Sequence, residues 1–187
     1  MPSQLIAAPA IEPIAPAEAK LFLRIEHDDE DAAIAALIVV ARQHVEAATR
    51  RALITQDWRL VRDAWPPGGV IHVLPAPLQT LIGVEVADEA GTMHALDLQN
   101  FVVDSVGSRI AFAPWTPMRP GRAAGGIVIE VRVGEGDTAD AVPAPLRQAM
   151  LMLIAHWYEQ RGVAAPPQRE LPQGVAALLA PFRRVSL

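Results

Sequence analysis

The side chains best suited to chemistry in this sequence form an acidic cluster near its beginning. Glu26, Asp28, Asp29, Glu30 and Asp31 fall within one six-residue stretch. Divalent cations prefer several such oxygen ligands, so a metal site is one hypothesis. The stretch lacks the glycine and the regular ligand spacing of a calcium loop. We favour a second interpretation, in which the acids suit the dipole at a helix start and Asp28 or Asp29 is its N-cap.

The other residue types that enzymes use form no recognisable catalytic group. The sequence has no cysteine, which excludes disulfides, thiol nucleophiles and thiolate zinc sites. None of the five histidines begins an HExxH motif, and His44–Glu46 lacks the cysteine ligands of a zinc deaminase. No serine lies in a G-x-S-x-G elbow, and no phosphate loop follows the glycines at 121–126. We therefore predict no catalytic residue, no metal and no cofactor.

Composition and charge argue against several further classes of protein. The 187 residues are 51% hydrophobic and carry a formal net charge of −5, as in a globular domain without a general affinity for nucleic acid. No apolar run reaches the roughly 18 residues of a membrane span. The first 20 residues have no basic region of the kind that begins a signal peptide. We expect a protein made in the cytoplasm, with no membrane partner.

Hydrophobic periodicity predicts two long helices. The first should run from about residue 29 to 51 and the second from about 143 to 161, with a short helix over 16–25 before them. In the first long helix we place Arg42, Glu46 and Arg50 on the side away from the core, with Glu46 and Arg50 as an i,i+4 pair. The residues predicted to face the core are Ile34, Leu37, Ile38, Ala41, Val45, Ala48, Leu146, Met150, Leu153, Ile154 and Trp157.

Residues 53–133 are predicted to be rich in β-structure. The candidate strands are 55–63, 70–74, 80–87, 93–98, 101–104, 109–112 and 126–133. Residues 88–92 read as a hairpin turn in which Gly91 supplies a positive φ. Residues 1–15 are rich in proline and alanine and are expected to be irregular. The predicted fold class is α+β: a helical body with a central β-rich portion and extended N- and C-terminal arms.

This organisation suggests a flexible N-terminal arm over 1–15, one domain over 16–162 and a C-terminal tail over 163–187. The tail is short and apolar, cannot fold alone, and is expected to dock on a partner. The loop over 114–126 permits two interpretations. It is either a binding tip, since aromatic residues and arginine are favoured at interfaces, or a loop folded over the sheet.

Three segments of the sequence carry a resemblance to a known family. They are LRIEHDDEDAAIAALIVVARQHVEAATRRALITQDW (Leu23–Trp58), VPAPLRQAMLMLIAHWYEQRG (Val142–Gly162) and LPQGVAALLAPFRRV (Leu171–Val185). Together they resemble phage head–tail connector proteins, also called adaptors or head-completion proteins, of long-tailed phages and gene transfer agents. The similarity covers roughly residues 20–185 and is weakest in the β-rich middle. One departure is Arg50, where many relatives have glycine at the end of a helix.

The resemblance implies a structural protein, assembled in the bacterial cytoplasm, in the neck of a virion or phage-like particle. Twelve copies would form a ring between the portal and a tail-proximal neck or stopper protein. DNA would pass through the ring without specific binding, and the negative net charge suits this because gripping phosphate needs cations. The implied portal-binding residues are Leu171, Pro172, Val175, Leu178, Leu179, Phe182, Arg183 and Arg184. A tail-side contact is assigned to Trp115, Met118, Arg119 and Arg122.

Two alternative functions remain open at this point. One is a tail-assembly factor or small enzyme that uses the 114–126 loop over a pocket. The other is a small nucleic-acid-associated module, which would show salt-sensitive binding to DNA.

Overall fold

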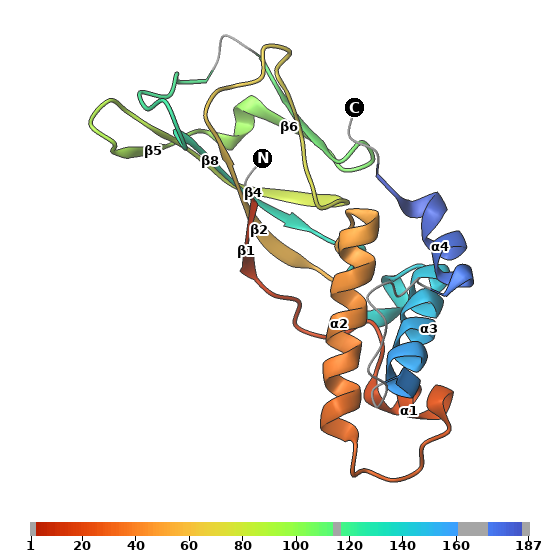
Figure 1. The fold of residues 1–187 in the computed structure, drawn as a ribbon. Helices are drawn as coiled ribbons and strands as arrows, with labels where there is room; N and C mark the ends of the chain where they lie inside the picture. Colours follow the sequence, from red (N-terminus) through yellow and green to blue (C-terminus); the bar gives the residue numbers. More distant parts are fainter. Residues whose placement is uncertain (1–2, 114–116, 161–171, 185–187) are drawn as a thin grey trace. The chain divides into compact units, whose positions relative to one another are not determined.

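The computed structural model describes residues 3–113, 117–160 and 172–184, and it combines helices with antiparallel sheets (Figure 1). The chain divides into two compact units. Residues 1–9 and 55–134 form a β unit, and residues 10–54 and 135–187 form a helical unit. These boundaries differ from the predicted ones at residues 15 and 162. The division by function into arm, connector domain and portal-binding tail stays a prediction.

In the residues that the structure describes, the helical unit has four helices around one apolar core. They are α1 (Pro16–Leu23), α2 (Asp31–Thr49), α3 (Ala144–Gln160) and α4 (Gln173–Leu179), with single 3₁₀ turns at Ala139–Ala141 and Ala180–Phe182. Helix α2 packs on α3, and α4 packs on both. The largest fully buried side chains of this core are Ile14, Ile34, Ile38, Leu53, Ile54, Leu146 and Met150. The two long helices predicted from periodicity are therefore confirmed, with ends shorter by one or two residues.

The ends of α2 differ from the prediction. Its N-cap is Glu30, and no side chain caps the helix there. The prediction that Asp28 or Asp29 is the N-cap is wrong, because the Asp28 carboxylate binds Lys20 instead. The helix ends at Arg50 in the left-handed conformation, with φ 56° and ψ 37°. Glycine usually takes this position. Arg50 adopts the same left-handed conformation, so the C-cap geometry is kept although the residue differs.

Helix α2 is also long and apolar enough to cross a membrane by length and composition alone. The core helix of a soluble protein passes the same test. The inward side chains Ile34, Ile38 and Val45 are fully buried within the helical unit, which is the arrangement of a core helix.

The described part of the β unit contains two antiparallel sheets. The larger has the order β1-β2-β8-β4-β5 and the smaller the order β3-β7-β6. The strands are β1 (Ser3–Ala7), β2 (Gln56–Arg62), β3 (Val70–His72), β4 (Leu78–Ala87), β5 (Met93–Ala95), β6 (Phe101–Asp104), β7 (Arg109–Phe112) and β8 (Ile127–Val133). Every strand predicted between residues 53 and 133 is present. The hairpin turn at 88–92 is confirmed as well, with Gly91 at φ 86°.

Strand β1 overturns the expectation that residues 1–15 are irregular. Ser3–Ala7 pairs with β2 at the edge of the larger sheet (Figure 1). In this pairing Gln4 lies opposite Arg59 and Leu5 opposite Trp58. All five residues of the strand are exposed. Because no side of the strand faces a core, its sequence shows no alternation of apolar and polar residues, and its partner residues lie 50 or more positions away.

Candidate assembly surfaces

The acidic cluster near the start of α2 joins parts of the helical unit to one another. Lys20 Nζ lies 2.5 Å from Asp28 Oδ1 and 2.7 Å from Asp31 Oδ1, and the Tyr158 hydroxyl of α3 donates to Glu30. The hydrogen bond from Lys20 lowers the pKa of the Asp28 carboxyl below its ordinary value. Within the part of the chain that the structure describes, no three His, Asp or Glu side chains are grouped to hold a cation. The cluster has a structural role.

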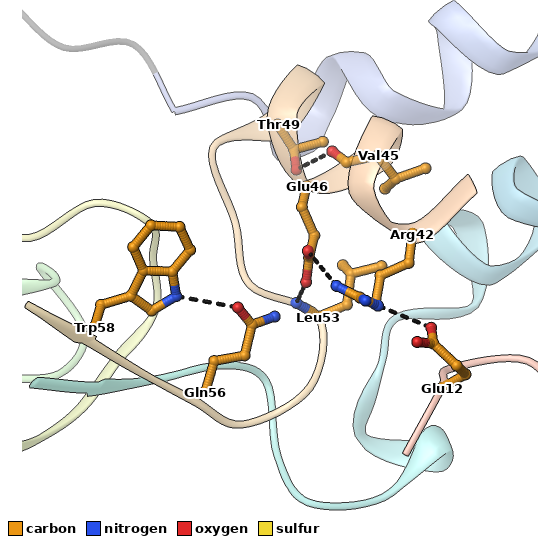
Figure 2. A network of polar contacts seen from close by, with 8 residues as sticks. All are labelled: Glu12, Arg42, Val45, Glu46, Thr49, Leu53, Gln56 and Trp58. Atoms are coloured by element: carbon orange, nitrogen blue, oxygen red, sulfur yellow. Dashed lines mark hydrogen bonds and ion pairs between the residues drawn. The ribbon is translucent and has the colours of Figure 1, made fainter. Parts of the chain in front are cut away.

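Arg42 is the centre of a polar network in the helical unit (Figure 2). Its Nε donates to Glu12 Oε2 at 2.8 Å, and its Nη1 donates to Glu46 Oε2 at 2.9 Å. Burial would lower the pKa of Arg42, but the hydrogen bonds and charges of Glu12 and Glu46 raise it above its ordinary value. Both carboxylates therefore keep the guanidinium charged in a place where only 7% of the residue is exposed.

This network corrects two predictions about α2. Arg42 does not lie on an exposed face, and Glu46 pairs with Arg42 rather than with Arg50. Helical periodicity places these residues opposite the apolar stripe. It cannot show that Glu12, 30 positions away, covers that side of the helix.

The same network fixes the connections that enter and leave α2. Glu46 Oε1 accepts a hydrogen bond from the backbone N–H of Leu53 at 3.0 Å (Figure 2). Glu12 belongs to the segment that precedes α1, and Ile14 beside it is fully buried. Arg42 and Glu46 together thus hold one segment before α1 and another after α2 against the same helix.

The end of α2 also holds the C-terminal segment. The Thr49 hydroxyl donates to the carbonyl oxygen of Val45 at 2.7 Å (Figure 2). The carbonyl oxygen of Thr49 accepts a hydrogen bond from the backbone N–H of Arg184 at 3.0 Å. The segment is therefore tied to the last turn of α2 by its own backbone.

The predicted portal-binding residues fall into two groups. Val175 and Leu179 are fully buried in the core of the helical unit, and Leu178 and Phe182 pack against that core. The surface on which the tail was expected to dock is therefore supplied by the chain itself. Arg183 is exposed, while Pro172 and Arg184 are half-buried. Leu171 lies outside the described residues.

Residues 117–126 fold over the β unit, which is the second of the two interpretations of this loop. Trp65 Nε1 donates to the carbonyl oxygen of Met118 at 2.8 Å, and the N–H of Gly121 donates to the carbonyl oxygen of Ala87 at 2.8 Å. A Cβ at Gly121 would lie 2.2 Å from the backbone nitrogen of Glu89, so glycine is required there.

The predicted tail-side residues of this loop are accessible where they are described. Met118, Arg119 and Arg122 are exposed, and Trp115 lies outside the described residues. One hydrogen bond ties Met118 to Trp65 in the segment after β2, and the other ties Gly121 to Ala87 of β4. The loop thus presents these side chains from a fixed position.

A small hollow adjoins this loop but does not have the features of an active site. Its volume is about 40 Å³, far below the roughly 300–1,000 Å³ of typical ligand pockets. Its lining residues are Leu96, Asp97, Asn100, Phe101, Phe112 and Pro117. The one carboxylate among them, Asp97, accepts the backbone N–H of Gln99 at 3.0 Å. The alternative of a small enzyme gains no support from this geometry.

Unpaired cationic side chains are the other feature suited to partner binding. Five exposed arginines form no ion pair with another residue in the described ranges: Arg24, Arg50, Arg119, Arg122 and Arg183. Arg24 and Arg50 both end helices in the left-handed conformation. Arginine forms planar, bidentate contacts with carboxylates, so these positions suit acidic groups on a protein partner.

Comparison with known proteins points to one family. The model of the phage gp6-like head–tail connector protein family matches residues 17–82, from α1 into β4. A chain in the neck of an empty gene transfer agent particle, computed with C6 symmetry, is 28% identical with a TM-score of 0.83. A chain in the virion of a native gene transfer agent particle is 26% identical with a TM-score of 0.83. No curated protein matches.

A third solved structure, the neck of a native gene transfer agent particle computed with C12 symmetry, contains a chain that is 27% identical with a TM-score of 0.75. Each of the three likenesses covers 100% of this chain and 97% of the other. The resemblance seen in the sequence is therefore confirmed along the whole chain. Residues 17–82 of this protein thus match the phage gp6-like head–tail connector family, and the whole chain is similar to chains from the neck and virion of gene transfer agent particles.

Proposed function

We propose that this protein is a head–tail adaptor, twelve copies of which form a ring between the portal and the tail of a phage-like particle. The observation that carries the proposal is the full-length likeness to a chain in a particle neck computed with C12 symmetry. A closed ring of identical copies needs a head-to-tail contact, in which each copy offers two different surfaces. The ring extends the DNA channel toward the tail, in the neck of the particle.

The portal contact is assigned to the exposed part of the C-terminal segment. Pro172, Arg183 and Arg184 have accessible surface, and Arg50 adds a further exposed cation next to Thr49, which binds the backbone of Arg184. Val175 and Leu179 act indirectly, because their burial docks the segment on the helical unit. The other residues assigned to the portal contact are Leu178 and Phe182, which are half-buried, and Leu171, which lies outside the described residues.

The tail-side contact is assigned to Met118, Arg119 and Arg122 of the β unit, together with Trp115. Hydrogen bonds to the sheet support this assignment, because a loop held in place loses little conformational entropy on binding. The partner is a tail-proximal neck or stopper protein. The net charge of −5 supports passage of DNA without specific binding.

A charge reversal tests the portal assignment more sharply than removal of the tail. Deleting residues 171–187 would take Val175 and Leu179 out of the core and damage the fold. Arg183→Glu changes one exposed side chain, and Arg24→Glu is a matched control, because Arg24 is also exposed and unpaired in the helical unit.

Purified portal is mixed with each variant and viewed by negative-stain electron microscopy. The parent and Arg24→Glu should form rings docked on the portal, and Arg183→Glu should leave most portals bare. Docking by Arg183→Glu at the level of the parent would overturn the portal assignment. A parent protein that stays monomeric and ignores the portal would overturn the adaptor function itself.

A further inference from the structure

Strand β1 adds almost nothing to the core of its own unit. All five of its side chains are exposed, including Leu5 at 41% and Ile6 at 47%. It is joined to β2 by their ladder, and the register of that ladder shifts between Leu5 and Ala7. An edge strand of this kind is held by backbone pairing, which any identical β2 edge can offer equally well.

The segment just after β1 is short and extended, which suits a form in which β1 does not pair with β2 of its own chain. Residues 8–11 connect the strand to Glu12, whose carboxylate binds Arg42 at 2.8 Å, and to the fully buried Ile14. Pro9 and Pro13 disfavour the helical region for the residues before them and so extend this connection. Four extended residues reach about 14 Å at most. The connection is therefore a short hinge, anchored firmly on its C-terminal side.

We propose that β1 is exchanged between neighbouring copies, so that Ser3–Ala7 of one copy pairs with β2 of the next copy around the ring. This inference rests on the proposed ring. The pairing uses the same ladder as within one chain, so it needs no new surface. Short hinges favour such an exchange over folding back. An exchange repeated in one direction closes around a ring, as a head-to-tail contact requires.

Cysteine crosslinking separates exchange from pairing within one chain. Gln4 and Arg59 lie directly opposite in the ladder, where side chains of neighbouring strands are close together. The sequence has no cysteine, so introduced thiols are the only ones present. Chains carrying Gln4→Cys are mixed with chains carrying Arg59→Cys, assembled with purified portal, and treated with a short bis-maleimide crosslinker. Mixing Gln4→Cys with Glu89→Cys chains is the control for random collision.

Covalent dimers from the Gln4→Cys and Arg59→Cys mixture, absent from the control mixture, are the expected result. Rings seen by negative stain in the same sample together with monomers alone on a denaturing gel would overturn the exchange and leave the ring standing. A sample without rings would overturn the proposed function and the exchange with it. The doubly substituted chain, treated in rings, should give a ladder of covalent multimers rather than closed monomers.

Removal of the strand gives a second measurement. A chain lacking residues 1–8 should have an unfolding midpoint only slightly below that of the parent, because every side chain of β1 is exposed and the strand lies at the edge of its sheet. It should form few rings on the portal, because the exchanged strand is missing. Rings in parent numbers from the shortened chain would contradict the exchange.

Discussion

Replacing Glu46 separates its two roles in the helical unit. One carboxylate oxygen accepts from Arg42 at 2.9 Å, and the other accepts from the backbone N–H of the fully buried Leu53 at 3.0 Å. Glu46→Gln keeps an acceptor for Leu53 but removes the charge beside Arg42. Glu46→Ala removes both interactions and leaves the N–H of Leu53 without an acceptor.

The expected magnitudes follow from these contacts. A hydrogen bond to a charged group contributes about 1.5–3 kcal/mol, and a buried N–H left unsatisfied costs a further 1–3 kcal/mol or so. Alanine regains about 0.4 kcal/mol through its helix propensity. Glu46→Ala should therefore lower the free energy of unfolding by about 2–5.5 kcal/mol. Glu46→Gln should lower it by about 1–2 kcal/mol, because Arg42 also keeps its bond to Glu12.

Urea unfolding followed by circular dichroism at pH 7 measures both values. Glu159→Ala is the matched control, because Glu159 is exposed on α3 and should change stability by no more than about 0.5 kcal/mol. Equal losses for Glu46→Ala and Glu46→Gln would show that the N–H of Leu53 does not depend on Glu46. Losses no larger than that of Glu159→Ala would refute the network as a stabilising feature.

Three further predictions concern other parts of the molecule. Leu179→Ala should cost about 2–4 kcal/mol in urea unfolding, because it opens a cavity in the helical core; an unchanged midpoint would place the side chain outside that core. Gly121→Ala should cost about 1–3 kcal/mol, since the added Cβ collides with the backbone at Glu89, and a neutral result would contradict the close approach. Arg132 lowers the pKa of the Asp57 carboxyl through hydrogen bonds. The stability from this pair is therefore present above the ordinary pKa of 3.8 and lost as pH falls through the lower folded value. Asp57→Asn should make acid unfolding curves less steep than those of the parent between about pH 4 and 2, and curves of equal steepness would argue against the pair.

The regular elements were predictable because their signals are local. The apolar stripe of α2, the alternation in β8 and the turn at Gly91 each lie within a few residues of sequence. Such patterns report which side of an element faces a core. The fold class and the strands between 53 and 133 followed from them, and the family resemblance came from the same helical segments.

What the sequence did not predict depends on contacts between distant residues. Glu12 covers Arg42 across 30 positions, and the residues of β1 pair with residues 50 or more positions away. Burial of Val175 and Leu179 likewise depends on α2 and α3 lying together. When two contacting residues are far apart in the sequence, their spacing follows no rule from which the contact could be predicted. At Arg42 only one of the two acids, Glu46 at four positions away, is visible as a partner in the sequence, while Glu12 lies 30 positions away.

The helical unit is interrupted in the sequence by residues 55–134 of the β unit. A ribosome adding about 5–20 residues per second therefore needs roughly 4–16 seconds to pass from the end of α2 to the start of the segment that carries α3. During that interval the β strands can pair, while Ile34, Ile38 and Val45 have no core to enter. Synthesis thus exposes the most apolar helix of the chain for several seconds. Until α3 and α4 have been synthesised, the apolar face of α2 stays uncovered, which is the kind of surface that chaperones bind.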